Sequence, residues 1–314
     1  MMRKIMNRIK GLTQQHQQNN FLGKDLSKLY RGIEEVKLLN AKILSQQNRM
    51  AQEEILHNLN KAEFKVFSQW GDDGIIQFLV DYLEPENHLF IEFGVENYEE
   101  ANSRLLMINN CWKGLVMDSS QEHINHIRKS DVYWKYQLEA MPAFVNRNNI
   151  NNLLQTYLKG SQADLMIIDI DGNDYWIWDA IDVTNPTIVI VEYNSIFGCD
   201  RAITIPYKDD FFRTKSHYSN LYYGASLPAL FHLAQQKGYQ LIACNSNGNN
   251  AYFVRADKMK KLKALAPSQA FRAASFRESR TVDHQLSYLN VEAAQQLLSG
   301  LPVYNVMTGK EEAF

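Results

Sequence analysis

The stretch YQLIACNSNGNNAYFVR, residues 239–255, holds two apolar segments separated by a short polar turn. Residues 239–244 and 250–255 have the length and the residue types of β-strands, and NSNGN between them is rich in turn-forming residues. This pattern predicts an antiparallel hairpin. The segments that precede the hairpin decide which sheet it joins.

Five strand–helix units come before the hairpin, and such a series predicts a mostly parallel sheet. Apolar runs predict strands at 89–93, 114–118, 133–138, 164–169 and 187–193. Helices are expected near 99–110, 120–130, 148–159, 174–181 and 224–237. The predicted fold class is α/β, a Rossmann-like, doubly wound, mostly parallel sheet with a C-terminal antiparallel hairpin and an N-terminal helical extension. We expect the extension over residues 1–60, the Rossmann-like domain over 61–260, and a helical tail packed on that domain over 261–314.

The N-terminal extension contains a heptad pattern over residues 26–50. Apolar side chains recur at alternating steps of three and four residues, and Asn40 occupies an inner position of this seam. A buried asparagine at such a position specifies partner number and register. Leu39 and Leu44 flank the seam where a simple zipper carries charges, and Gly32 weakens the helix. The pattern favours a helix that packs on its own body or forms a homo-oligomer.

Composition excludes several classes of partner. The net charge of the 314 residues is −2, which gives no reason to expect nucleic acid. Three widely spaced cysteines form no disulfide framework, and no apolar run reaches the ~18 residues of a membrane span. We therefore expect a cytoplasmic protein. Residues 1–12 place apolar side chains on one helical face among arginines and lysines, so a weak contact at the inner face of a membrane is the alternative to a frayed terminus.

Acidic residues end four of the predicted strands, namely Glu92, Asp118, Asp169 and Glu192. In an open parallel sheet, ligands bind beyond the carboxyl ends of the strands. Four acidic ends facing one crevice suit a ligand that carries hydroxyl groups and positive charge. The first turn, EFGVENYEE, has a single glycine and several glutamates that would repel phosphate, so it is not a dinucleotide site.

S-adenosylmethionine satisfies these requirements, because it has no phosphate and carries a sulfonium, an ammonium and a ribose diol. Asp118 is placed to accept hydrogen bonds from the diol. The alternative role for Asp118 is to cap the helix that begins near Gln121.

Seven blocks of the sequence resemble the FkbM-like methyltransferases, in particular a bacterial branch associated with surface-polysaccharide biosynthesis. The blocks lie within residues 64–255 and read FSQWGDDGIIQFL, FIEFGVENYEEANSRLL, WKGLVMDSS, IIDIDGNDYWIW, IVIVEYNSIFG, HYSNLYYGASLPAL and NSNGNNAYFVR. The resemblance implies an S-adenosylmethionine-dependent O-methyltransferase that acts on a sugar hydroxyl of a glycan or glycolipid precursor. The family's glycine-rich E/D-x-G-x-G is reduced here to EFGVEN. That departure keeps a second hypothesis open, a non-catalytic binding or assembly protein of a carbohydrate pathway that retains the fold.

The same resemblance assigns the cofactor-binding residues. The methionine end of the cofactor would be lined by Glu92, Gly94, Glu96 and Asn97, and the ribose would be held by Asp118 and Ser119. Gln69 and Asp72, in SQWGDDG, would close over the cofactor. Helix capping is the alternative for these last two residues.

Methyl transfer to a hydroxyl requires that the hydroxyl lose its proton, and two routes fit the sequence. His217 would be the general base in one route, with Asp169 and Asp171 beside the reacting groups. In the other route Mg²⁺ would lower the hydroxyl pKa, with ligands from Asp169, Asp171, Glu192 and Asn194. The stretch IIDIDGNDYW is not an EF-hand, because its glycine and its final acidic position are misplaced.

Asp169 has a third role open to it, to hold the methionine amine or the acceptor. Acceptor contacts are expected from Arg213, Lys215 and Tyr218. Trp176 would stack on the sugar, or else belong to the hydrophobic core.

Overall fold

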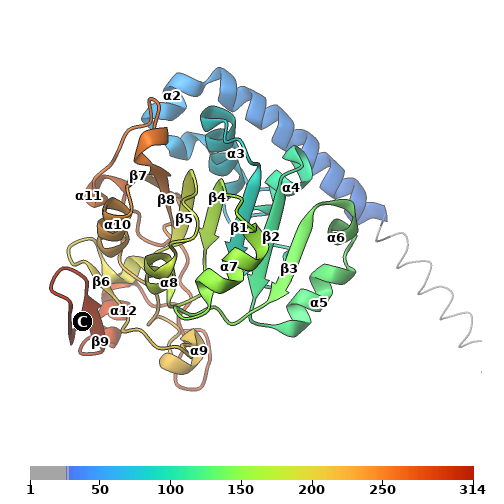
Figure 1. The fold of residues 1–314 in the computed structure, drawn as a ribbon. Coiled ribbons are helices and arrows are strands. Elements are labelled where there is room, and N and C mark those ends of the chain that lie inside the picture. The colour runs from blue at the N-terminus through green and yellow to red at the C-terminus, as the bar shows by residue number, and fades with distance from the viewer. Residues whose placement is uncertain (1–25, 27) are drawn as a thin grey trace, which may run out of the picture.

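A computed structural model describes residue 26 and residues 28–314, and its centre is a seven-stranded sheet (Figure 1). The strands are β1 (Leu89–Phe93), β2 (Lys113–Asp118), β3 (Leu138–Pro142), β4 (Leu165–Ile168), β5 (Ile188–Glu192), β7 (Tyr239–Cys244) and β8 (Asn250–Arg255). Their order is β3-β2-β1-β4-β5-β8-β7. The first five strands are parallel, and β8 is antiparallel to both β5 and β7. The α/β fold and the terminal hairpin predicted from the sequence are confirmed.

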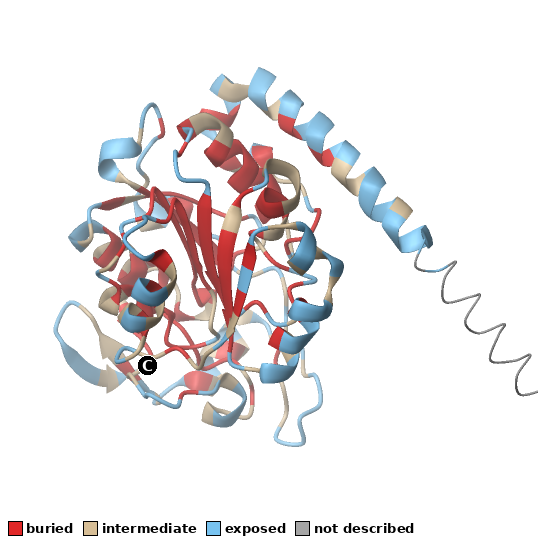
Figure 2. Cartoon of the chain, turned by 45° about the vertical axis from the view of Figure 1, so that its right-hand side comes forward, coloured by how far each residue is buried: buried red, intermediate tan, exposed pale blue. Residues whose placement is uncertain are grey.

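Helices cover both faces of the sheet, which is why its central strands are apolar along their whole length. The helices are α3 (Asp72–Leu83), α4 (Arg104–Asn110), α5 (Gln121–Lys129), α7 (Ile150–Leu158), α8 (Asp174–Ala180) and α10 (Leu227–Gln236). Phe90, Ile167 and Ile190 pack toward α3, α4 and α5. The alternate residues of the same strands pack toward α7, α8 and α10. Figure 2 shows these strands as a buried layer between the helices.

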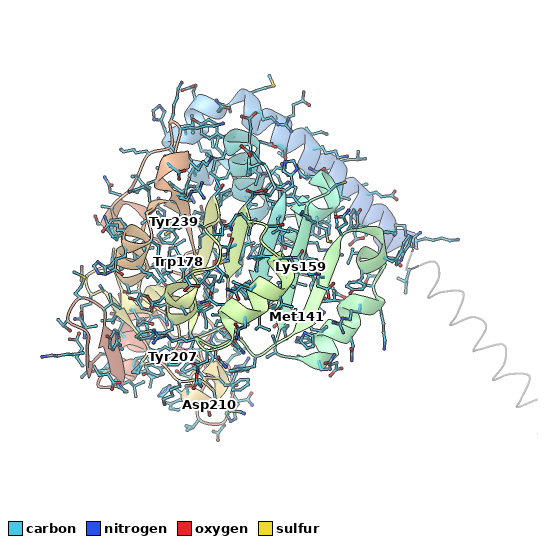
Figure 3. All side chains as sticks on the ribbon, in the orientation of Figure 1. Met141, Lys159, Trp178, Tyr207, Asp210 and Tyr239 are labelled. Atoms are coloured by element: carbon cyan, nitrogen blue, oxygen red, sulfur yellow. The ribbon has the colours of Figure 1, made fainter. Side chains whose placement is uncertain are left out.

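Aromatic residues of α8 belong to this core. Trp178 is buried and meets Tyr239 of β7 edge to face, with ring centroids 5.9 Å apart (Figure 3). Trp176 is also buried, and its Nε1–H donates to the carbonyl of Ile205 at 2.9 Å. Of the two roles foreseen for Trp176, the structure therefore gives it the core position.

One predicted strand is wrong. Residues 133–138 were expected to be extended, but Asp131–Lys135 form α6 and β3 begins only at Leu138. Asp131 and Lys135 are joined across one helical turn by an ion pair of 2.8 Å. None of the α6 side chains is buried, so the aromatic and β-branched residues here do not serve a sheet.

The C-terminal tail was expected to be helical, but it is only partly so. It contains α11 (Pro267–Ala270) and α12 (Val291–Leu298), but also the strands β9 (Pro302–Asn305) and β10 (Lys310–Ala313). These pair with β6 (Ile203–Thr204) in a small antiparallel sheet of order β10-β9-β6. The remaining short elements are α2 (Gln52–His57), η1 (Leu59–Ala62), η2 (Ser195–Phe197), α9 (Arg213–Ser216) and η3 (Ala256–Lys258).

Residues 28–50 form one long helix that crosses the molecule near α3 and α4 (Figure 1). Its Leu38 and Ala41 contact a small cluster with Val66, Phe67 and Leu105. The expected membrane contact of residues 1–12 lies outside the described residues. Within the described part of the chain, no helix has the length and apolar character needed to cross a membrane.

Candidate functional site

The carboxyl edge of the sheet carries a row of four residues from neighbouring strands. The registers of β2, β1, β4 and β5 set Asp118, Gly94, Asp169 and Glu192 side by side, in that order. Side chains alternate across a strand, so the three carboxylates point to the sheet face that α3, α4 and α5 cover. The acidic strand ends therefore lie side by side, as predicted. They flank the boundary between β1 and β4, where the strand order of the sheet changes direction.

Asp169 and Glu192 form the electrostatic centre of this row. Neither carboxylate makes a hydrogen bond to any described residue, and Oε2 of Glu192 is fully buried. Burial raises the pKa of Asp169 well above its usual value, and the nearby carboxylates, Glu92 among them, raise it further. Burial likewise raises the pKa of Glu192, with the charge of Asp169 as the next cause. Each of the two neighbouring groups therefore disfavours the charged form of the other.

Arg213 of α9 supplies positive charge next to this pair. Its Nη1 donates to Asp171 at 2.6 Å, and its Nε donates to the carbonyl of Asn220 at 2.7 Å. The guanidinium lies 3.9 Å from the centre of the Tyr223 ring. Burial acts to lower the pKa of Arg213, but Tyr223 and the neighbouring carboxylates raise it overall, so the residue stays charged. The predicted acceptor contact Arg213 thus lies at the acidic site.

The turn after β1 is built for a close approach of two strand ends. Gly94 has φ +72°, and a Cβ at this position would lie 1.7 Å from the backbone oxygen of Asp169. No side chain fits there, so the single glycine kept in EFGVEN is the one that the strand packing requires. The side chain of Glu96 is exposed, and Asn97 accepts the N–H of Glu99 at 3.0 Å.

Asp118 ties this turn to the end of β2. Its Oδ2 accepts the N–H of Glu96 at 2.9 Å, and its Oδ1 accepts the N–H of Ser120 at 2.8 Å. The cap of α5 is Ser120, whose Oγ accepts the N–H of His123, so Asp118 is not the helix cap. Ser119 is exposed beside it.

Glu92 has a structural task in addition to its charge. Its two carboxylate oxygens accept the N–H groups of Asn102 and Ser103, at 2.8 and 3.0 Å, just before α4. The Ser103 hydroxyl also donates to it. Burial raises the pKa of Glu92, as it does for Asp169 and Glu192.

The block SQWGDDG places its polar residues differently from the prediction. Gln69 is exposed, and only its carbonyl is engaged, by Lys65 Nζ at 2.8 Å. Asp72 is fully buried and accepts from the side chains of Asn245, Asn250 and Tyr252. These contacts fasten α3 to the hairpin, so we do not retain Asp72 as a cofactor ligand.

Two residues of this block that the sequence reasoning passed over lie at the site. Oδ2 of Asp73 accepts the three consecutive N–H groups of residues 66–68, whereas its Oδ1 is buried without a partner among the described residues. Asp73 is close enough to Glu92 to raise the pKa of that residue. Trp70 stacks on Phe276, and its Nε1 is also buried without a described partner. Buried polar atoms left unpaired in this way call for an explanation such as a bound ligand, and the two adjacent aspartates of the block were the signal available in the sequence.

The four proposed magnesium ligands do not form one site, although Asp169 and Glu192 are neighbours. Asn194 donates to the carbonyls of Leu221 and Tyr223 and accepts the N–H of Ile196, so its amide is fully used. Asp171 is exposed and paired with Arg213. No group of three or more acidic, histidine or cysteine side chains with metal-binding geometry occurs among the described residues. The expectation of a Mg²⁺ site built from these residues is therefore corrected.

His217 follows α9 and is partly buried. Its Nδ1 lies 2.7 Å from the hydroxyl of Ser219, and burial lowers its pKa, so the imidazole is neutral near pH 7. Its ring packs on Tyr218, with centroids 4.5 Å apart. Lys215 is exposed, and its ammonium lies 4.5 Å from the centre of the Phe212 ring. Of the residues expected to contact the acceptor, only Arg213 lines the cavity described next.

A cavity of about 290 Å³ has Arg213 in its lining. Tyr193, Asn194 and Tyr223 line it from the sheet side, and residues 274–278 and 289–292 of the tail close it. Arg213 thus contacts a residue next to the acidic row, Asp171, and also lines a partly aromatic cavity. This cavity could not be predicted from the sequence, because the tail that closes it has no pattern linking it to β5.

No family profile and no curated protein sequence matches this chain. Among solved structures, it is similar to the N-terminal domain of EvdMO1 with SAH bound, at 8% identity over 65% of this chain and 94% of that chain, with a TM-score of 0.38. It is similar to an O-methyltransferase from Bacillus cereus in complex with SAH, at 12% identity over 68% and 100% of the two chains, with a TM-score of 0.40. It is also similar to an S-adenosylmethionine-dependent methyltransferase from Clostridium acetobutylicum, at 12% identity over 67% and 98%, with a TM-score of 0.37. At these TM-scores the fold assignment rests on the strand order of the chain itself.

Proposed function

We propose that this protein is an S-adenosylmethionine-dependent O-methyltransferase that acts on a sugar hydroxyl of a glycan or glycolipid precursor. The observation that carries the proposal is the acidic row at the carboxyl edge of the sheet, where the carboxyl groups of buried Glu192 and partly buried Asp169 have no hydrogen-bond partner among the described residues. Such a row favours a ligand that is cationic and rich in hydroxyl groups. The resemblance to FkbM-like methyltransferases supports the same activity and motivates the carbohydrate acceptor.

The residues present fit S-adenosylmethionine, which supplies the methyl group when it is bound. Asp118 accepts two N–H groups and has His123 Nδ1 at 3.3 Å, and its carboxylate retains further lone pairs for a ribose diol. Glu92 and Asp73 add negative charge for the ammonium and sulfonium groups. Gly94 leaves the backbone of the first turn free of side-chain bulk. The unpaired Nε1 of Trp70 and Oδ1 of Asp73 are a donor and an acceptor for the same ligand.

The Asp169–Glu192 pair is the proposed general base. With one proton shared between them, the pair keeps one negative charge and can accept the proton of an acceptor hydroxyl as the methyl group is transferred to its oxygen. His217 is less suited, because it does not line the cavity next to Arg213 and because burial lowers its pKa, which makes the imidazole a weaker base. The positive charge of Arg213 would stabilise the remaining negative charge of the Asp169–Glu192 pair.

The acceptor is proposed to enter through the cavity next to Arg213. Tyr193, Tyr223 and Phe276 offer aromatic surface for a sugar ring, and Asn290 and Glu292 offer polar contacts. This arrangement would bring an acceptor hydroxyl to the Asp169–Glu192 pair past Arg213.

Calorimetry with S-adenosylhomocysteine tests the cofactor. We expect wild-type protein to bind, and Asp118→Ala to weaken binding by about 1.5–3 kcal/mol, because charge-assisted hydrogen bonds are lost. Glu122→Ala, on the exposed side of α5, is the control and should bind as the wild type does. Absence of binding by folded wild-type protein would refute the enzyme and favour the non-catalytic carbohydrate-pathway protein.

The base is tested by methyl transfer to a panel of glycan acceptors. We expect Glu192→Gln to lower the rate by ~10²–10⁴ without loss of S-adenosylhomocysteine binding, and His217→Ala to retain most of the rate. The reverse ranking of the two variants would assign the proton transfer to His217.

A further inference from the structure

The helix of residues 28–50 has two different faces, and only one of them is covered by the protein itself. Leu38, Ala41 and Ser45 lie against the body, and the Asn48 amide donates to the carbonyl of Ala62 at 3.0 Å. Ion pairs of Arg49 with Asp81, at 3.1 Å, and of Glu34 with Arg104, at 3.3 Å, fix the helix on this side. The orientation of the helix on the body is therefore defined by packing and charge.

The opposite face is the heptad seam. We define the seam as the eight residues Leu26, Leu29, Ile33, Val36, Asn40, Ile43, Gln47 and Met50. Every one of them is exposed, and the apolar members expose between 48% and 83% of their surface. Figure 2 shows the outward side of this helix largely in the exposed colour. A stripe of this size that no part of the described chain covers marks an interaction surface.

We propose that the seam pairs with the seam of a second copy of this chain in a parallel two-stranded coiled coil. The seam covers three and a half heptads, which is enough for a specific coiled coil. Asn40 lies at an a position, where two parallel copies place the two amides opposite each other and each amide satisfies the other. In an antiparallel pair centred on the same seam, Asn40 would face an apolar residue and lose this partner.

The flanking positions agree with pairing of two identical helices. In a parallel pair, Leu39 of one copy faces Leu44 of the other, which widens the apolar contact, and both leucines are exposed here. At the flanking positions one heptad earlier, Gly32 of one copy faces Lys37 of the other, so this pair places no like charges opposite each other. The body contacts the helix on the side away from the seam, and the two bodies would lie on the outside of the pair without meeting.

A membrane surface is the less favoured occupant. The seam includes the amide side chains of Asn40 and Gln47, and acidic Glu34 and Glu35 lie on the same helix. A helix that lies on an anionic surface carries mainly basic residues beside its apolar face.

Light scattering after size exclusion, and sedimentation equilibrium over a concentration series, measure the mass of the full chain. We expect twice the monomer mass of 36.4 kDa. Ile33→Glu/Ile43→Glu should give the monomer, because charges at a and d positions oppose pairing. Lys42→Glu is the matched control, since it makes the same net charge change at an exposed position off the seam, and it should remain a dimer.

Cysteine cross-linking tests the geometry independently of that variant. Under mild oxidation, Asn40→Cys should give a disulfide-linked dimer, whereas Lys42→Cys and the wild type, with its exposed Cys111, should not. A wild-type mass of 36.4 kDa at all concentrations would overturn the proposal, as would seam-dependent binding of a monomer to vesicles of phosphatidylcholine and phosphatidylserine. Failure of Asn40→Cys to cross-link in a dimer would overturn the parallel arrangement.

Discussion

At the scale of single residues, Asp169 and Glu192 stand out because they are adjacent and their carboxylates make no hydrogen bonds to other described residues, although Glu192 is buried and Asp169 partly buried. Burying a carboxylate without a partner costs free energy, and a protein avoids that cost unless the group has a task. Asp72 and Asp73 show the contrast, because their buried carboxylates accept several hydrogen bonds each. The unpaired groups are therefore the ones that we assign to chemistry.

Glu192→Gln is expected to stabilise the fold against unfolding at neutral pH. The pKa values of Asp169 and Glu192 are raised in the folded state, so the folded protein binds more protons than the unfolded chain. The stability of the wild type therefore falls as the pH rises above about 4, the ordinary carboxyl pKa. The glutamine side chain does not ionise, so the variant does not lose stability in this way as the pH rises. We expect its melting temperature to exceed that of the wild type by at least about 2–3 °C at pH 8, and the gap to close near pH 4.

Thermal unfolding at several pH values measures this effect. Glu86→Gln, at an exposed position before β1, is the control and should show no such trend. A gap between Glu192→Gln and wild type that does not change with pH would contradict a raised pKa at this site.

At the scale of elements, the site depends on how α3 is held against the hairpin. Asp72 at the start of α3 accepts hydrogen bonds from Asn245 and Asn250 at the two ends of the turn and from Tyr252 of β8. The next residue, Asp73, gathers the N–H groups of residues 66–68. The hairpin thus positions the segment that brings Trp70 and Asp73 to the acidic row.

Asp72→Ala is expected to destabilise the protein by about 3–5 kcal/mol, because the three side-chain donors are left buried without an acceptor. Tyr252→Phe removes one donor and should cost only about 1 kcal/mol. Chemical denaturation measures both values, with Asp210→Ala at an exposed position as the control. Equal effects of Asp72→Ala and Asp210→Ala would show that this network does not hold the hairpin.

At the scale of the whole molecule, the C-terminal tail leaves the large sheet after β8 and packs against the segment that follows β5. Val303 and Leu298 are fully buried in a cluster with Phe197 and Ile203. The Tyr222 hydroxyl donates to the carbonyl of Pro302, which joins the tail to the segment that follows α9. The tail also closes the cavity beside Arg213, so it contributes to the proposed acceptor site.

Val303→Asp is expected to lower the melting temperature by about 6–12 °C, because an unpaired charge is placed in a packed cluster. Val282→Asp makes the same substitution at a position that is 72% exposed, and it should leave the melting temperature unchanged within about 1 °C. Similar melting temperatures for the two variants would mean that the tail is not part of the folded unit.

The sequence alone determined the elements whose periodicity is strong. The alternation of apolar runs and helical stretches gave the parallel sheet, and the turn in residues 245–249 gave the hairpin, because these signals are local. The acidic strand ends were also predictable, since parallel strands end at one edge. The heptad of residues 26–50 correctly predicted a helix. It did not reveal which face the body covers.

Tertiary structure decided what each polar side chain does. Asp72 and Asn194 had the residue types of ligands, but contacts with segments far away in the chain engage them fully. The strand expected at 133–138 became α6, because no neighbouring strand pairs with it. Strands β9 and β10 depend on β6, almost a hundred residues earlier in the chain. Such outcomes follow from long-range contacts, whose free energies exceed local preferences and which a single sequence does not display.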